Sequence, residues 1–401
     1  MLSAVIADDL TGAADAAVEF AKRGYPTVAL LDWQSRLPPT IPVVAADTES
    51  RHLTPPSAYE RVYAAAGLLR TAGSLTFYKK IDSAIRGHLG AEIDAVLDAT
   101  GLPFAVVAPA FPANGRVTVN GYQCDRGLPL EQTAFAQDPR WPVRDSHVPR
   151  VIAAQSCRQV STLGLEVVRR GERALATALD EKQGAGSGIV VVDAETDDDL
   201  AVIAASMRRL LSPALAVGSA GLAEHCARLL PLLSAPVASH PKPKADRILI
   251  VAGSIHPRTA LQVERAVAAG EAVVASVPIG GEALPTPWPS AQAIILRLEG
   301  KAPPAKPDGG RRLVGRLAAR AREGVSRLSM EGLVLVGGDT AVAVLEALGA
   351  RGIAIEHEVQ PGVPAGRLVG GAFAGLPVVT KAGAFGDERA LLAALAYLRG
   401  R

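Results

Sequence analysis

The sequence predicts an α/β protein of two domains, each with a mostly parallel sheet covered by helices, and with the active site expected in the interdomain cleft. Two observations support this fold class. Short aliphatic runs alternate with alanine-rich amphipathic stretches along most of the 401 residues. The alternation breaks at residues 234–247, where prolines, serine and lysines without periodicity are typical of a linker, and then it restarts.

The first predicted domain spans residues 1–233 and is expected to bind the substrate. Its first helix starts at Thr11 and should stop near Lys22, because basic residues in a last turn followed by Gly24 are termination signals. The expected strands are 2–7, 27–32, 42–46, 74–79, 104–108, 189–193 and 214–218. The expected helices are 11–23, 57–70, 89–99, 197–211 and 219–230.

The second predicted domain spans residues 248–401, and the same alternation of strand and helix predicts its fold. Expected strands lie at 247–253, 272–277, 292–297 and 332–338, with a glycine- and proline-rich β stretch at 352–381. Expected helices lie at 257–269, 311–323, 340–348 and 387–398.

Composition excludes several classes of function. Lys and Arg number 42 against 40 Asp and Glu, and no long basic run exists, so we expect no nucleic-acid partner. No run of 18 or more apolar residues occurs, and no charged-then-apolar leader precedes the first strand, so we expect a cytoplasmic protein without a membrane partner. Cys124, Cys157 and Cys226 are far apart and fit neither a disulfide framework nor a zinc spacing.

The stretch "VIADDLTGAADAA" places Asp8 and Asp9 where the first strand meets the first helix. One acid there caps a helix and meets the positive end of its dipole, a contribution of about 0.5–2 kcal/mol. A cap needs one acid, and ligands of open α/β sheets bind beyond the carboxyl ends of strands. At least one of the pair is therefore predicted to contact a ligand, by binding hydroxyl groups, taking a proton or holding a cation.

A second cluster follows the strand that ends in "YKKIDSAIRGHLG". Lys80, Asp82, Ser83 and Arg86 fall within seven positions there, after Lys79. Such a run could be a solvated charged loop, but it fits better a site for an anion that carries hydroxyl groups. Arg can bind a carboxylate through two parallel hydrogen bonds, and Lys supplies a positive charge. In "VVAPAFPANGRVTVNG", Arg116 follows a stiff proline-containing connector and is the residue to test.

Three glycine-bearing strand ends in the second domain predict a phosphate ligand, because glycine lets a backbone approach a phosphate and helix N-termini present N–H groups to it. They are "VAGSIHPRTALQ", "VLVGGDTAVAVLEALG" and "VVTKAGAFGDERALLAAL", each leading into a helix. One such turn is also a plain helix cap, but three in one domain favour a nucleotide. Neither GxxxxGK[ST] nor GxGxxG occurs, which weakens a Walker-type or dinucleotide site.

Taken together and in order, the stretches "IADDLTGAADAA", "YKKIDSAIRGHLG", "APAFPANGR", "VAGSIHP", "VGGDTA" and "TKAGAFGDE" resemble the motifs of the four-carbon acid sugar kinases. That family was long catalogued as a domain of unknown function and includes threonate, erythronate and 3-oxo-tetronate kinases. The resemblance covers nearly the whole chain. It implies an N-terminal domain that binds the sugar acid, a C-terminal domain that binds ATP, and Mg2+-assisted phosphorylation of the C4 hydroxyl.

The resemblance also implies site residues. Those expected at the substrate are Asp8, Asp9, Lys80, Asp82, Ser83, Arg86 and Arg116. Those expected at the nucleotide are Ser254, Gly337, Gly338, Asp339, Thr340, Gly383 and Gly386. Arg86 would bind the substrate carboxylate or the transferring phosphoryl group, and Asp82 or Asp8 would accept or orient the hydroxyl proton. Metal ligands stay unassigned, with Asp387 an outside candidate for the base or the Mg2+ shell.

Two other functions fit the pattern less well. A sugar-acid dehydrogenase with a divergent nucleotide site would transfer hydride without releasing ADP. A non-catalytic sugar-acid sensor would bind ligand without ATP turnover, but it needs neither the glycine turns nor a linker. The sequence does not select the C4 acid or its stereochemistry, and a homodimer is the default expectation.

Overall fold

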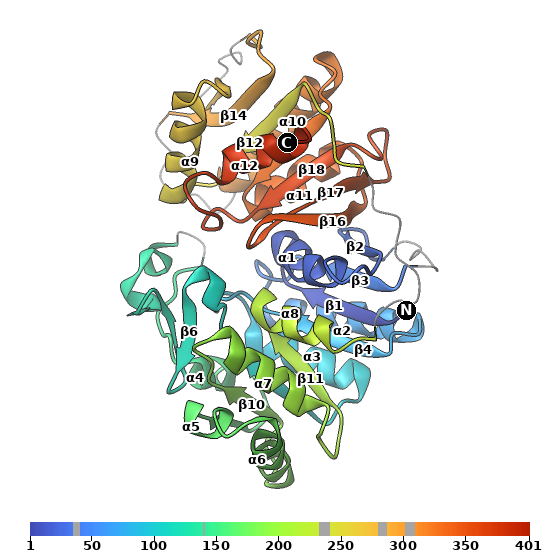
Figure 1. Cartoon of the computed structure of the whole chain (residues 1–401), viewed down its shortest axis with the longest axis vertical. Helices are drawn as coiled ribbons and strands as arrows, with labels where there is room; N and C mark the ends of the chain where they lie inside the picture. Colours follow the sequence, from blue (N-terminus) through green and yellow to red (C-terminus); the bar gives the residue numbers. More distant parts are fainter. Residues whose placement is uncertain (35–40, 139–140, 232–240, 280–286, 301–308) are drawn as a thin grey trace. The chain divides into compact units, whose positions relative to one another are not determined.

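The computed structural model describes residues 1–34, 41–138, 141–231, 241–279, 287–300 and 309–401. The chain divides into two compact units, the first formed by Met1–Thr27 and Asp32–Ala235 and the second by Val28–Leu31 and Pro236–Arg401. Residues 234–240 of the predicted linker lie outside the described residues. Each unit is an α/β structure, which confirms the predicted fold class (Figure 1).

The first unit is built on a parallel sheet with the strand order β3-β1-β4-β11-β5-β10-β9. Its strands are β1 (Ser3–Ala7), β3 (Val43–Asp47), β4 (Thr76–Lys80), β5 (Phe104–Ala108), β9 (Val160–Leu163), β10 (Ile189–Val192) and β11 (Ala214–Gly218). Most of these strands are buried along their whole length, which requires helices on both faces. The carboxyl ends of β3, β1 and β4 are neighbours at one edge of the sheet.

The helices of the first unit pack in two groups. The first group runs α1, α8, α7 and α6 in succession, and the second joins α2, α3 and α4. Their bounds are α1 (Leu10–Ala21), α2 (Pro55–Thr71), α3 (Leu89–Thr100), α4 (Val148–Ala153), α6 (Glu172–Gly184), α7 (Asp197–Met207) and α8 (Ala220–Arg228), with a short α5 (Leu165–Val168). Helices α4, α5 and α6 and strand β9 were not among the expected elements.

A small antiparallel sheet of β6 (Arg116–Val119), β7 (Tyr122–Asp125) and β8 (Leu128–Pro129) was also not expected. Its first hairpin turns at Asn120 and Gly121, both with positive φ (52° and 76°), as a tight hairpin turn requires. The sequence carried this Asn-Gly signal. Asp193 holds the turn by accepting hydrogen bonds from the backbone N–H groups of Asn120 (2.6 Å) and Gly121 (2.9 Å).

The second unit has the strand order β13-β14-β12-β15-β18-β17-β16-β2, parallel from β13 to β18 and antiparallel between β18, β17 and β16. The strands are β12 (Ile248–Ala252), β13 (Val273–Pro278), β14 (Ala293–Glu299), β15 (Gly332–Val336), β16 (Gly352–Gln360), β17 (Val363–Val369) and β18 (Pro377–Lys381). The helices are α9 (Pro257–Ala268), α10 (Gly309–Arg327), α11 (Gly338–Ala347) and α12 (Ala390–Leu398). Aliphatic side chains of β12, β15, β18, α9 and α12 form one buried core.

Strand β2 (Thr27–Leu30) lies early in the sequence, yet most of it belongs to the second unit. It completes the sheet beside β16, and the N–H of Leu31 donates to the carbonyl of Arg351 (3.0 Å). Gly352 makes this close approach possible, because a Cβ there would collide with the carbonyl oxygen of Ala29 and lie 3.1 Å from the Cα of Leu30.

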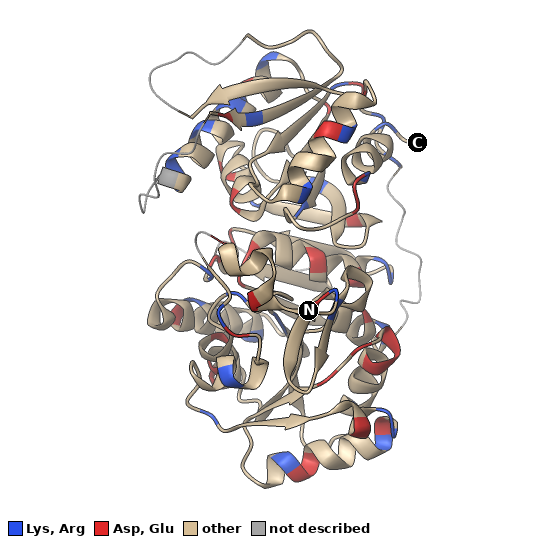
Figure 2. Cartoon of the chain, turned by 90° about the vertical axis from the view of Figure 1, so that its left-hand side faces the viewer, with Lys and Arg blue, Asp and Glu red and all other residues tan. Residues whose placement is uncertain are grey.

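Charges of both signs are mixed on the helices that face the viewer in Figure 2. No described helix is both long and apolar enough to cross a membrane.

We predict that Gly352→Ala lowers the free energy of unfolding by about 2–4 kcal/mol, because the added methyl group must push β2 away from β16. Chemical denaturation measures this loss. The matched control is Gly315→Ala in α10, an exposed helical glycine with no atom within 4 Å of an added Cβ, which should be neutral or stabilising. Equal stability of the two variants would contradict the tight β2–β16 contact.

Candidate active site

Three neighbouring strand ends bring charged side chains together in the first unit. Asp8 and Asp9 follow β1, Arg51 lies in the loop after β3, and Lys80 to Arg86 end β4 and continue beyond it. These segments are far apart in sequence, and the parallel pairing of β3, β1 and β4 makes them adjacent.

Arg51 connects the two adjacent acids. Its Nε donates to Asp8 Oδ2 (2.7 Å) and its Nη1 donates to Asp9 Oδ2 (2.8 Å). Asp9 is also the N-cap of α1, since its Oδ1 accepts from the N–H of Gly12 (2.8 Å) and its Oδ2 accepts from the hydroxyl of Thr11 (2.9 Å). The capping explanation therefore holds for Asp9, while Asp8 takes no part in the cap.

Asp8 is 2% exposed, and its Oδ1 is buried without a hydrogen-bond partner among the described residues. Burial alone would raise the pKa of this carboxyl group, but the charges of Arg51, Lys79 and Lys80 and the hydrogen bond from Arg51 lower it overall. Asp8 is consequently an ionised acceptor with one oxygen bound by Arg51 and the other available to a donor.

Lys80 brings a buried positive charge to the same edge. Its ammonium donates to the carbonyl of Ile81 (3.0 Å) and approaches the first turn of α1 closely, since a Cβ on Gly12 would lie 3.1 Å from Lys80 Nζ. The side chain is 4% exposed. A cation so placed is suited to a second anion beside Asp8 and Asp9.

The neighbouring Lys79 has a structural environment instead. Its ammonium is 2.7 Å from Glu92 Oε2 on α3, and Glu92 Oε1 accepts from the hydroxyl of Ser50 (2.7 Å). Ser50 is hydrogen-bonded to Thr48, whose hydroxyl is 2.8 Å away. This buried network ties β4 and α3 to the loop that carries Arg51.

The loop after β4 holds Asp82 and Arg86, which form an ion pair, and Arg86 Nη1 also donates to Asp138 Oδ2 (2.9 Å). Burial opposes ionisation of Asp82, but the charges of Arg86, Arg51 and Arg116 hold its pKa well below the usual value. Ile85 between them has φ = +53°, a strained conformation for a β-branched residue of the kind that concentrates at functional sites.

Arg116 joins this loop from the hairpin. Its Nη1 donates to the hydroxyl of Ser83 (2.5 Å), and its guanidinium lies 4.9 Å from the ring centroid of Phe135. Gln123 on the partner strand donates to the carbonyl of Ser83 (2.8 Å). The unexpected hairpin therefore supports the loop of Ser83 from two positions.

The last residue of β3, Asp47, adds a third carboxyl group near this edge. It is fully buried; its Oδ1 accepts from the N–H of Glu49 (2.8 Å), and its Oδ2 has no partner among the described residues. Burial raises the pKa of Asp47 well above its usual value, and the nearby charges of Asp9, Glu49 and Asp8 act in the same direction.

In the second unit, the three predicted glycine turns follow the adjacent strands β12, β15 and β18. Gly253, Gly337 and Gly383 lie against side chains of the neighbouring turns: a Cβ on Gly253 would collide with Thr340, and one on Gly383 with Ser254. A Cβ on Gly337 would lie 3.4 Å from Ser254, and its φ of +106° disfavours other residues. This is a backbone-lined edge of the kind that phosphates bind.

The remaining predicted residues of this unit lie around the same turns. Gly338 and Asp339 begin α11, and the N–H of Gly337 donates to the carbonyl of Lys381 (2.9 Å). Gly386 is slightly farther along, and its carbonyl accepts from Arg258 Nη1 (3.1 Å). Asp387, the outside candidate, accepts from the side-chain amide of Gln360 (2.9 Å) and from the N–H of Arg389 (2.8 Å), which accounts for its oxygen Oδ1 structurally.

Four residues of the first-unit site were not among the expected ones: Arg51, Asp47, Glu92 and Asp138. Arg51 and Asp47 follow or end a predicted strand, so the same rule that selected Asp8 applied to them. No sequence pattern linked Glu92 on α3 or Asp138 to the site, because their contacts depend on tertiary structure.

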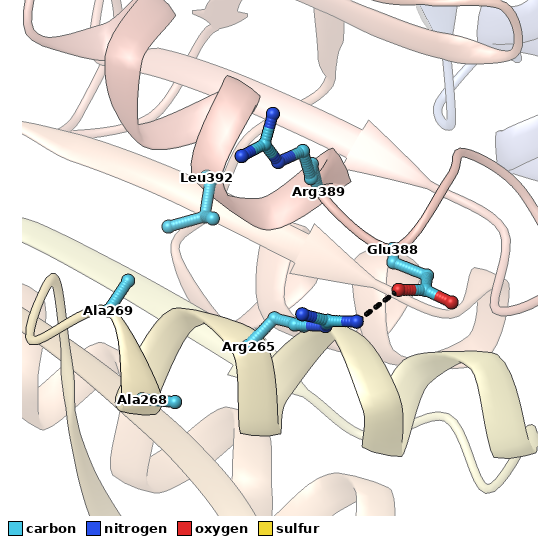
Figure 3. Close-up of a pocket in the computed structure, with 6 residues that line it drawn as sticks. All are labelled: Arg265, Ala268, Ala269, Glu388, Arg389 and Leu392. Carbon is cyan, nitrogen blue, oxygen red and sulfur yellow. Dashed lines mark hydrogen bonds and ion pairs between the residues drawn. The ribbon is translucent and has the colours of Figure 1, made fainter.

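A shallow pocket between α9 and α12 lies apart from these residues. Figure 3 shows Arg265 of α9 paired with Glu388 (2.7 Å), with Arg389, the N-cap of α12, and Leu392 of α12 also lining the pocket. It contains none of the predicted site residues. Across the described residues, no group of three or more His, Cys, Asp and Glu side chains could hold a metal ion.

Two family models match successive parts of the chain. A family model described as a sugar-binding N-terminal domain matches residues 3–226, and one described as a nucleotide-binding C-terminal domain matches residues 249–391. A D-threonate kinase of Salmonella typhimurium is 35% identical over 98% of this chain and 97% of its own. A D-erythronate kinase of Heliobacterium modesticaldum is 36% identical over 98% and 96% of the two chains.

The chain belongs to the four-carbon acid sugar kinase family. It is a phosphotransferase, as expected from the sequence, and its C-terminal domain implies use of ATP. A 3-oxo-tetronate kinase of Brucella melitensis is 30% identical over 96% of this chain. Two solved structures share the fold of this kinase family: one from Salmonella typhimurium titled a putative tRNA synthase (TM-score 0.78, 26% identity, 98% of each chain) and one from Haemophilus influenzae (TM-score 0.73, 23% identity, 98% of this chain and 100% of the other).

We predict that Asp47→Asn stabilises the ligand-free protein at neutral pH. The raised pKa means that folded Asp47 keeps its proton at pH values where the unfolded residue has lost it, so the contribution of Asp47 to wild-type stability should fall as pH rises above about 4. Each pH unit within this window costs about 1.4 kcal/mol, and Asn removes the cost while it retains an acceptor for Glu49.

Denaturation between about pH 4 and about pH 8 measures the effect. The control is Asp246→Asn, a change at an exposed residue that should leave the pH profile unaltered. An Asp47→Asn variant less stable than wild type at pH 7 would contradict this prediction.

Proposed function

We propose that the protein transfers the terminal phosphoryl group of ATP to the C4 hydroxyl of a four-carbon sugar acid, of the threonate, erythronate or 3-oxo-tetronate type. The observation that carries this proposal is the buried Oδ1 of Asp8, an ionised acceptor without a partner among the described residues. A substrate hydroxyl is a donor that would satisfy it. The names of the related kinases supply the substrate class.

On the acid side, Asp8 accepts the C4 hydroxyl and orients its oxygen for attack. Asp8 and Asp82 are each ion-paired with an arginine, and we assign this role to Asp8 because its Oδ1 is buried without a partner among the described residues. Lys80 and Arg86 provide positive charge for the substrate carboxylate or the transferring phosphoryl group. Asp9, Ser83 and Arg116 complete the proposed set, with Asp9 also serving as the helix cap.

On the nucleotide side, Ser254, Gly337, Gly338, Thr340 and Gly383 form the phosphate cradle, and Asp339 and Gly386 flank it. The residues present fit a nucleotide, because the turns are so closely packed that a Cβ on Gly253 would collide with Thr340 and one on Gly383 with Ser254, and such glycine turns at helix N-termini offer backbone N–H groups to phosphates. Mg2+ bound with ATP would neutralise phosphate charge. It needs one or two carboxylates besides the phosphates, which agrees with the absence of an all-protein metal cluster among the described residues.

The chemistry asked of the chain is mainly positioning and charge neutralisation, as in other phosphoryl transfers. Asp8 fixes the attacking oxygen and receives its proton late, when the bond to phosphorus has formed. A carboxylate with a lowered pKa suits this role, because a strong base is not needed when the transition state is loose. Cations that balance the charge on the transferred group contribute most.

The deciding experiment is an ADP-release assay with ATP, Mg2+ and a panel of four-carbon sugar acids, followed by phosphorus NMR of the product. A phosphate ester at C4 is the expected product. Reduction of NAD or NADP by the same acids without ADP release would identify a dehydrogenase, and acid binding without turnover would identify a sensor.

We predict that Arg86→Gln lowers kcat by about a hundredfold or more while the fold is retained, because a guanidinium that neutralises developing charge is lost. Steady-state kinetics with saturating ATP measure kcat, and circular dichroism monitors the fold. The matched control is Arg228→Gln, which removes an exposed ion pair with Glu224 and should leave kcat unchanged. Activity of Arg86→Gln within about twofold of wild type would place the anion site elsewhere.

We also predict that Gly383→Ala raises KM for ATP by about tenfold or more with little change in KM for the acid. The new methyl group would occupy the space beside Ser254 and lie 3.2 Å from the Cβ of His256. Gly315→Ala again serves as the control, now for both KM values. Equal increases in the two KM values would argue against a nucleotide site at this turn.

A further inference from the structure

Lys381 is the last residue of β18, directly before the third glycine turn, and among the described residues no acid pairs with it. The side chain is 1% exposed. Its ammonium donates to the carbonyl of Ala382 (3.0 Å) and lies 3.4 Å from that of Gly383, and it forms no ion pair within the described part of the chain. A buried ammonium held by carbonyl oxygens alone is costly.

The surroundings of Lys381 increase this cost. The charged residue whose field acts on it is Arg258 of α9, which has the same sign. Strands β12 and β15 contain no ionisable residue. Other titratable groups on the packed elements are Arg367 of β17, which pairs with Glu356, Asp339 at the start of α11, and His256 and Asp387 in the turns on either side.

Burial and the positive charge of Arg258 together lower the pKa of Lys381 to about 7. The carbonyls that it contacts belong to the turn that the proposed nucleotide site uses, where Gly383 lies against Ser254 and Thr259 donates to the carbonyl of Gly383 (3.1 Å). The protonation state of Lys381 is thereby coupled to the shape and charge of this turn.

We propose that Lys381 is a positioning residue of the nucleotide site, whose ammonium holds the Ala382–Gly383 turn toward the phosphates, and that nucleotide binding takes up a proton at its Nζ. The inference rests on the proposed function for the identity of the ligand as a nucleotide. The negative charge of the bound phosphates stabilises the charged form of Lys381, whose ammonium otherwise contacts carbonyl oxygens.

The direction of the pH dependence follows from linkage. In the free protein, Lys381 loses its proton as pH rises through about 7. Bound phosphates raise the pKa of the amine, so the nucleotide complex keeps the proton to higher pH. Affinity should therefore weaken with rising pH above about 7, by up to about tenfold per unit, and binding should absorb a fraction of a proton.

The test is calorimetric titration of the full chain with ADP between about pH 7.5 and about pH 9, in pairs of buffers that differ in ionisation enthalpy. Wild type should show weakening affinity and proton uptake. Lys381→Arg, which keeps its charge throughout this range, should bind with little pH dependence, and Lys381→Met should bind weakly without proton uptake. Lys242→Met, at an exposed lysine, should behave as wild type.

Tight ADP binding by wild type with a flat pH profile and no proton uptake would overturn the role of Lys381 and leave the proposed function standing. The same profile in wild type and Lys381→Met would overturn it as well. Failure of the wild-type protein to bind ADP at any pH would overturn both. The wild-type measurement decides the matter even if a variant does not fold.

Discussion

The first unit depends on Arg51, which binds two adjacent carboxylates through different nitrogen atoms. Asp8 and Asp9 repel one another, and burying Asp8 alone would favour its protonated form. Arg51 reverses this preference because its planar, permanently charged group satisfies both acids at once. Removal of one partner from such a buried cluster would leave an uncompensated buried charge, which is strongly destabilising. The ion pairs therefore hold the loop after β3 and the end of β1 together.

The second unit handles charge in the opposite way. Its three turns hold glycines, hydroxyl groups, Asp339, Asp387 and the buried Lys381, whose ammonium contacts two carbonyl oxygens and, among the described residues, no carboxylate. In the first unit Arg51 pairs with Asp8 and Asp9, Arg86 pairs with Asp82 and Asp138, and the Oδ1 of Asp8 is buried without a partner among the described residues. In the second, the buried ammonium of Lys381 forms no ion pair within the described part of the chain. The two edges therefore differ in how their charges are balanced, which suits the proposed acid site in one unit and the proposed phosphate site in the other.

The sequence predicts those features that depend on local pattern. The sequence locates the strand ends, the glycine turns and the residues after them, because hydrophobic periodicity and turn-forming residues are local signals. Arg51 follows the same strand-end rule, in "DTESRH" after the third strand of the chain, but no motif quoted for the resemblance includes it. The pairing of Lys79 with Glu92 joins residues 13 apart and the contact between Arg116 and Ser83 joins residues 33 apart, and no local pattern specifies either. The hairpin at Asn120 and Gly121, by contrast, has a local signal, because Asn-Gly is a preferred pair for a two-residue turn.

Because β2 contributes to the second unit, the two units do not correspond to two continuous stretches of sequence. Family models divide this chain near residues 226 and 249, yet residues 28–31 complete the sheet of the nucleotide-binding segment. Without them, β16 would present unpaired N–H and C=O groups along an open edge, a template for association with other chains. The nucleotide-binding segment consequently depends for its stability on residues encoded within the sugar-binding one, and the two cannot be exchanged independently between relatives unless β2 moves with the C-terminal half.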